Sequence, residues 1–170
     1  MTTYYRYLTA GTVATKALLD DRELLSVVKG SNQSVTNSTV KVNDTALTVS
    51  LAANAVYHVS VMVIVSGPTG ADWAQLWTFP TGVSGTRFSH GPELPVTTVR
   101  ATLVNARSAP IGTSLAYGTD GIENSAIREE IWLSTSGTAG SLTLTWAQNA
   151  AVASATTVLA GSWMTAYRVV

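Results

Sequence analysis

The chain has 170 residues, of which 46% are hydrophobic and 12% charged, and its ten basic and ten acidic residues give a formal net charge of +0. This balance excludes the strong field that gathers nucleic acid or an anionic membrane, and the absence of cysteine excludes disulfides and thiolate chemistry. The length suits one domain with a sizeable core, and the low charge indicates a surface that is largely buried in an assembly.

The first thirty residues (1–30) are expected to form an arm with one short helix. Thr9–Val28 is the best helix-forming stretch, and Thr15 can cap it. A helix of this length is not stable alone, so it must pack on the body or on a neighbouring chain. The candidate anchoring side chains are aromatic or leucine, namely Tyr4, Tyr5, Tyr7, Leu18, Leu24 and Leu25. Ordinary packing within the chain is an equally good interpretation.

Residues 31–170 are predicted to form a single β-domain rich in Thr, Val, Ser and Ala. Apolar and polar side chains alternate in Tyr57–Val63 and Ser141–Trp146, which indicates strands with one buried face. Turn residues at Val42–Thr45 and Ser66–Gly70 separate the strands. We expect about eight to ten strands in an antiparallel sandwich or barrel, because the sequence lacks the strand–helix alternation of a parallel sheet.

The five tryptophans raise the question of a ligand-binding surface. Alternation places Trp73, Trp77 and Phe79 on one face of a strand, where they could stack on sugar rings as a carbohydrate-binding surface. Packing in the core or between subunits is the interpretation we favour for these residues. The remaining tryptophans fit late strands and their apolar runs: Trp132, Trp146 and Trp163.

Few residues have the spacing of a catalytic or metal site. His58 is predicted on a strand and His90 in a turn, and without a third ligand of clear spacing we predict neither a metal nor a cofactor. The carboxylates are sparse, and Arg128–Glu130 is expected to form ion pairs or an interface rim. Two carboxylates from distant strands could serve glycoside hydrolysis, but no pattern points to them. The sequence also lacks a nucleophile elbow and a phosphate-binding loop, so we expect no enzymatic activity.

The sequence also bears on localisation. Met1–Arg6 lacks the apolar core of a secretory signal, and the longest apolar run, Val59–Val65, is too short to cross a bilayer. We therefore expect synthesis in a cytoplasm without export by the usual route and without membrane association.

Several stretches carry a family resemblance. They are Leu8–Gly11, Ser34–Thr39, Asn43–Asp44, Leu51–Tyr57, Gly140–Asn149 and Ala155–Met164. The last two combine a strand that ends in Trp-Ala-Gln-Asn with a Thr-rich strand and the sequence Ala-Gly-Ser-Trp. In these features the chain resembles small virion structural proteins from tailed phages of actinobacteria. The resemblance covers most of the chain and is weakest over Arg87–Glu130.

The resemblance implies a jelly-roll-like β-sandwich that assembles as a homotrimer in the virion, after synthesis in the cytoplasm of the host bacterium. It implies a minor tail or tail-associated protein, with a capsid decoration protein of the head surface as the alternative. The partners would be copies of itself and other virion proteins, either of the tail or the major capsid protein. In this interpretation residues 1–30 form the tether and residues 31–170 project outward. A binding module for host surface glycans is the second alternative.

Overall fold

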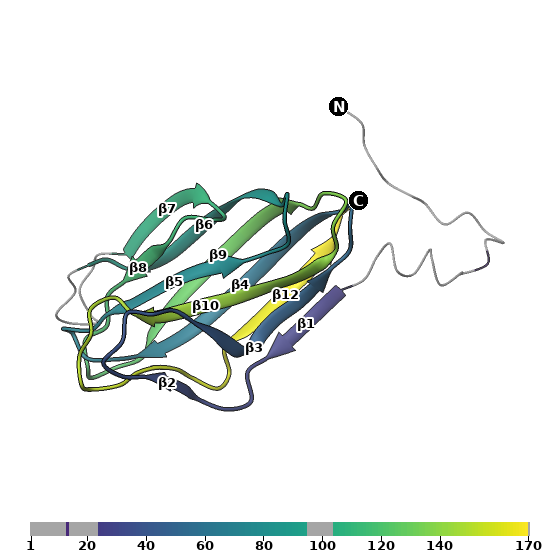
Figure 1. Cartoon of the computed structure of the whole chain (residues 1–170). Helices are drawn as coiled ribbons and strands as arrows, with labels where there is room; N and C mark the ends of the chain where they lie inside the picture. The colour runs from purple at the N-terminus through teal and green to yellow at the C-terminus, as the bar shows by residue number, and fades with distance from the viewer. Residues whose placement is uncertain (1–12, 14–23, 95–103, 170) are drawn as a thin grey trace.

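The structure is a computed structural model that describes residues 13, 24–94 and 104–169 (Figure 1). These residues form twelve β-strands and no helix. The strands are β1 (Leu24–Val28), β2 (Gln33–Val35), β3 (Val42–Leu51), β4 (Val56–Ser66), β5 (Trp73–Thr78), β6 (Ser84–Pro92), β7 (Val104–Pro110), β8 (Leu115–Tyr117), β9 (Ser125–Ser134), β10 (Gly140–Gln148), β11 (Thr156–Val158) and β12 (Trp163–Arg168).

The strands form two antiparallel sheets. The larger sheet has eight strands in the order β1-β12-β4-β9-β6-β7, and β11 joins it by pairing with β4 and with β2. The smaller sheet has four strands in the order β3-β10-β5-β8. The smaller sheet lies across the larger one as a second layer, and one core lies between them (Figure 1). The predicted all-β antiparallel sandwich is therefore confirmed.

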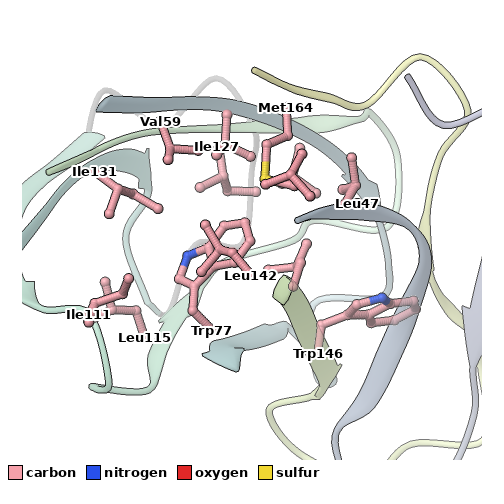
Figure 2. Packing of buried hydrophobic residues seen from close by; sticks show 14 of the residues in the cluster. Leu47, Val59, Trp77, Ile111, Leu115, Ile127, Ile131, Leu142, Trp146 and Met164 are labelled. Carbon is pink, nitrogen blue, oxygen red and sulfur yellow. The ribbon is translucent and has the colours of Figure 1, made fainter. Parts of the chain in front are cut away.

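Alternation within the strands explains how this core forms. In β4 every second residue from Tyr57 to Val65 is buried, and the residues between them are only partly covered. Valine dominates this strand because its branched side chain suits a pleated sheet. Trp77 and Leu142 of the smaller sheet point toward Val59 of the larger sheet (Figure 2). Each fully buried Val, Leu or Ile side chain contributes about 1.5–3 kcal/mol to the stability of such a core.

The helix predicted over Thr9–Val28 is wrong for its last five residues, because Leu24–Val28 form strand β1. The strand pairs antiparallel with β12 at the edge of the larger sheet. Leu25 and Val27 pack against the core, whereas Val28 is exposed, as the two-residue period of a strand requires. Pairing with β12 and the burial of alternate side chains outweigh the helix propensity of the leucines.

The other predicted features of the arm lie outside the described residues. They are the remainder of the helix and four candidate anchoring residues, Tyr4, Tyr5, Tyr7 and Leu18. Of the other two candidates, Leu24 is exposed and Leu25 packs against the core. The structure thus places the end of the expected arm inside the larger sheet.

The turn predicted at Val42–Thr45 does not separate two strands, because β3 continues through it to Leu51. The register between β3 and β10 shifts at this point, so β3 carries an irregularity there. The Asp44 carboxylate accepts hydrogen bonds from the backbone N–H groups of Ala46 and Leu47, both at 2.9 Å. The turn-forming chemistry of Asp is therefore present, but it bends the strand locally instead of reversing the chain.

Candidate functional site

Strand β9 runs through the middle of the larger sheet, between β4 and β6, and carries a polar cluster on each of its faces. Alternation turns Glu129 inward, where it is 1% exposed, and Glu130 outward. The inward cluster lies between the two sheets. The outward cluster lies on the far side of the larger sheet and faces away from the core.

In the inward cluster, the Glu129 carboxylate is surrounded by hydrogen-bond donors from both sheets. It accepts from Trp77 Nε1 at 2.7 Å, from Arg87 Nη1 at 3.3 Å and from the Tyr117 hydroxyl at 3.3 Å. Gln75 Nε2 donates to it as well. Trp77 and Gln75 come from β5, Tyr117 from β8 and Arg87 from β6, so one carboxylate ties four strands together.

Burial raises the pKa of Glu129, and the positive charge of Arg87 together with the donated hydrogen bonds opposes this rise. Every neighbour that bonds to the carboxylate is a donor, which matches the acceptor-only ionised form. Arg87 is also buried, and its second terminal nitrogen donates to the Thr113 carbonyl. Because the donors to Glu129 come from strands of both sheets, the cluster joins the two sheets.

Tyr117 connects this cluster to a second arginine. Burial and the nearby Glu129 charge raise the pKa of Tyr117 to about 12. Its ring lies 5.9 Å from that of Trp73, and the guanidinium of Arg107 lies 4.6 Å from the Tyr117 ring centroid. These contacts hold the short strand β8 in place against β5 and β7.

A second buried ion pair fixes the chain that follows β1. Lys29 Nζ lies 3.0 Å from both carboxylate oxygens of Asp44, and both side chains are fully buried. Trp146 Nε1 donates to Asp44 at 3.2 Å, and Gln33 accepts from Lys29 at 3.2 Å. Because Asp44 lies in β3 and Trp146 in β10, the pair attaches the N-terminal edge of the larger sheet to the smaller sheet. The sequence pattern around Lys29 predicts no role for this residue.

The outward side of the larger sheet carries exposed aromatic side chains in cross-strand rows. One row follows the register from β1 to β6 through Leu24, Tyr167, His58, Trp132 and Thr86. We call this side the outer aromatic face and define it by its largest and charged side chains: Leu24, Val28, His58, Met62, Phe88, Arg128, Glu130, Trp132, Trp163 and Tyr167. Trp132, Tyr167 and Phe88 are 46%, 46% and 47% exposed.

The charges on the outer aromatic face neutralise one another. Glu130 accepts from Arg128 Nη2 at 3.0 Å and from the Ser60 hydroxyl at 2.9 Å. His58 Nε2 lies 3.0 Å from the other Glu130 oxygen, and the His58 ring lies 4.8 Å from that of Trp132. Such partly exposed pairs contribute about 0–1 kcal/mol, so this cluster shapes the surface more than it stabilises the fold.

The three candidate ligand-facing aromatics have a different role. The alternation predicted for them is correct, but Trp73 and Trp77 are 0% and 2% exposed and Phe79 packs against the core. A buried ring has no free face for a sugar, so the carbohydrate-binding interpretation is wrong for Trp73 and Trp77, while for the partly buried Phe79 it stays a prediction. The core-packing interpretation is confirmed for Trp73 and Trp77.

Trp132 is the exposed tryptophan that sequence reasoning missed. The sequence places it in the apolar run Ile131–Leu133, yet both neighbours are buried and Trp132 points outward. The alternation of β9 could have found it, because a residue between two inward-facing neighbours must face the other way.

The two histidines lie on the same side of the larger sheet. His58 is on strand β4, as expected, whereas His90 is not in a turn but within β6, opposite Arg128 of β9. The turn prediction for His90 is wrong because Gly91 and Pro92 still pair with β7. The described part of the chain contains no group of three His, Asp or Glu residues that could hold a metal ion. It also contains no helix long and apolar enough to cross a membrane.

No protein-family model matches the chain, and no curated protein matches it. Among solved structures, it is similar to the tripod (BppUct-A-L) from the baseplate of bacteriophage Tuc2009, with 11% identity over 99% of this chain and 76% of that one and a TM-score of 0.34.

It is also similar to the Gt strain of infectious bursal disease virus, with 15% identity over 96% of this chain and 42% of that one and a TM-score of 0.21. For the VP2 subviral particle of that virus the identity is 15%, over 88% of this chain and 37% of that one, with a TM-score of 0.21. The chain thus spans less than half the length of these two. Likenesses this distant carry no functional argument, and the fold described above rests on the strands of this chain.

Proposed function

We propose that the chain is a structural subunit of a bacteriophage virion, a tail-associated component that assembles as a homotrimer and has no enzymatic activity. The observation that carries this proposal is a rigid β-sandwich, cross-linked inside by buried ion pairs, whose larger sheet presents a broad aromatic face with neutralised charges. Exposed apolar patches on soluble proteins mark surfaces for other macromolecules.

The inward clusters support the non-enzymatic part of the proposal. The buried carboxylates of Asp44 and Glu129 are each engaged by a cation and by a tryptophan N–H. Their bonding capacity is used within the core, where they stabilise the contact between the sheets. This is the expected arrangement of a scaffold rather than of a reaction centre.

The family resemblance supports the same proposal through the positions of its motif residues. Trp146 belongs to the Trp-Ala-Gln-Asn sequence and bonds to buried Asp44, and Gln148 of that sequence donates to the Ser154 carbonyl at 2.8 Å. Trp163 of the second stretch lies in β12, where it pairs with Met62 and Val28. Trp146 and Gln148 thus bond within the sandwich, and Trp163 lies on its outer aromatic face; we propose that the sandwich is of the jelly-roll type that the resemblance implies.

Labelling of intact particles of the source phage with a gold-conjugated antibody tests the location. Sparse label at the tail or its tip is the expected result. Dense label over the heads would overturn the tail assignment and make the chain a capsid decoration protein. An absence of label on all particles, with an antibody that recognises the free protein, would overturn the virion role itself.

The tether role proposed for the N-terminal arm is tested by a deletion that leaves every strand of the sandwich in place. Because β1 and Lys29 belong to the sandwich, the informative deletion removes residues 1–23 and leaves 24–170. We expect the shortened chain to fold and to be missing from particles. Normal incorporation would contradict the tether role and leave the virion role intact.

A further inference from the structure

The outer aromatic face is a broad surface of the larger sheet that the packing of the two sheets does not use. Trp132, Tyr167 and Phe88 come from three different strands and each keep nearly half of their area in contact with solvent. We propose that a second copy of this chain covers this face, an inference that rests on the proposed function because it names the partner in the assembly.

The size of the face matches what such a contact requires. Three aromatic side chains at about half exposure present roughly 300 Å² of ring surface, already in the range of the largest apolar patch on a typical monomer. Leu24 and Val28 add further apolar area, since they are 64% and 65% exposed. The five strands that carry the face, spaced about 4.8 Å apart and about 3.3 Å long per residue, give an area of roughly 600–700 Å², within the roughly 600–1,000 Å² that each partner buries in a standard interface.

The charge of the face favours a copy of itself over a charged partner. Arg128 and His58 converge on Glu130, so the charges are paired within one copy. Two such faces can therefore approach without the repulsion that unpaired like charges would produce. A nucleic acid or an anionic membrane would find no net positive field here.

The edge of the larger sheet supports the same partner. Within the described residues β1 is an edge strand, and its sequence Leu-Leu-Ser-Val-Val has no charged residue and no proline. Proteins usually guard such edges with lysine, proline or a bulge. The opposite edge, β7, carries Arg107 and Pro110. The unguarded edge adjoins the aromatic face through Leu24 and Val28, so one neighbouring copy would shield both.

The first arm of the test is self-association of the full chain, measured by sedimentation equilibrium over a wide concentration range. Trp132→Glu is compared with wild type and with Ile122→Glu, a matched control because Ile122 is 84% exposed and lies between β8 and β9, away from the face. We expect Trp132→Glu to weaken association at least about 30-fold, the effect of an interface hot spot, and Ile122→Glu to leave it unchanged.

The second arm does not depend on a disruptive variant and uses the absence of cysteine from the chain. Thr165→Cys places a thiol on the face in β12, between Ser26 and Ser60 in register, and Ile122→Cys is the control. We expect a bulky maleimide to react slowly with Thr165→Cys in the associated protein and faster on dilution. The reaction at Ile122→Cys should be fast at every concentration.

Four outcomes would overturn the inference. In the first outcome, the Trp132→Glu variant still associates and the thiol of Thr165→Cys still reacts quickly in the associated protein. The copies would then contact each other through another surface. Slow labelling of Thr165→Cys that persists in the monomer would mean that residues 1–23 of the same chain cover the face. A tryptophan fluorescence change with host-envelope polysaccharide, lost in Trp132→Glu, would make the occupant a glycan. A wild-type chain that stays monomeric would end the inference, while particle labelling would still decide the proposed function separately.

Discussion

Strand β9 carries one glutamate on each face of the larger sheet, and the two differ in what surrounds the carboxylate. Glu129 is enclosed by hydrogen-bond donors from β5, β6 and β8. Glu130 is partly solvated and contacts the side chains of Arg128 and His58. The same residue type at adjacent positions therefore joins the two layers on one side and shapes the surface on the other. The difference arises because charge interactions strengthen as water is excluded, while the penalty for leaving a charge unpaired grows with them.

The largest expected effect is on the inward side. Glu129→Ala would leave Arg87 buried without its carboxylate, at a cost of about 3–5 kcal/mol in the free energy of unfolding measured with urea. Replacing both partners, with Arg87→Met and Glu129→Leu, should recover only the part of this loss that comes from the unpaired charge, because Trp77, Gln75 and Tyr117 still lose their acceptor. A double variant as unstable as the single one would show that the lost hydrogen bonds and packing, not the unpaired charge, dominate the site.

Ile131 and Trp132 test the same difference between the inward and outward faces of β9 with apolar side chains. Ile131→Ala should cost about 2–5 kcal/mol because it opens a cavity in the core. Trp132→Ala removes a larger side chain but should change thermal stability of the dilute protein much less, since its ring lies on the outer aromatic face. Calorimetry of both variants checks this order, and equal losses would mean that Trp132 is part of the core.

Tyr117 gives the inward cluster a pH dependence at the alkaline end. The unfolded chain releases the phenolic proton near pH 10, whereas the folded chain holds it until about pH 12. The unfolded state thus binds fewer protons between these values, so stability should fall by up to about 2–3 kcal/mol as the pH rises through this window. Urea unfolding from pH 9 to 11.5 should show this slope in wild type, and Tyr117→Phe should flatten it.

The smallest effect is expected on the outward side. Glu130→Ala breaks contacts with Arg128, His58 and Ser60, yet it should cost less than about 1 kcal/mol because the group is partly solvated. The comparison with Glu129→Ala under identical urea conditions provides the control. A loss as large as that of Glu129→Ala would contradict the distinction between the two faces.

Much of the fold could be predicted because alternation is a local property. The period-two pattern of Tyr57–Val63 and Ser141–Trp146 is visible within a few residues, and both stretches lie in strands, β4 and β10. Burial of every second side chain needs no knowledge of the partner strand. The two-sheet antiparallel sandwich follows from many such strands joined by short turns.

The errors lie where distant residues decide the outcome. Leu24–Val28 has helix-forming leucines but becomes a strand, because β12 offers a pairing edge far along the chain. Val42–Thr45 has the residues of a turn, but β3 continues through it because both of its halves pair with β10. In both cases local propensity amounts to less than about 1 kcal/mol per residue, and tertiary pairing exceeds it.

Two-residue periodicity places Trp73 and Trp77 on one face of their strand and Glu129 and Glu130 on opposite faces of theirs, and it can be read from the residues alone. Which of the two faces lies inside depends on the tertiary structure. That choice depends on the smaller sheet, which places Gln75, Trp77 and Tyr117 against Glu129 and leaves Trp132 on the open side. Periodicity states which residues point the same way, whereas burial depends on the layer packed against them.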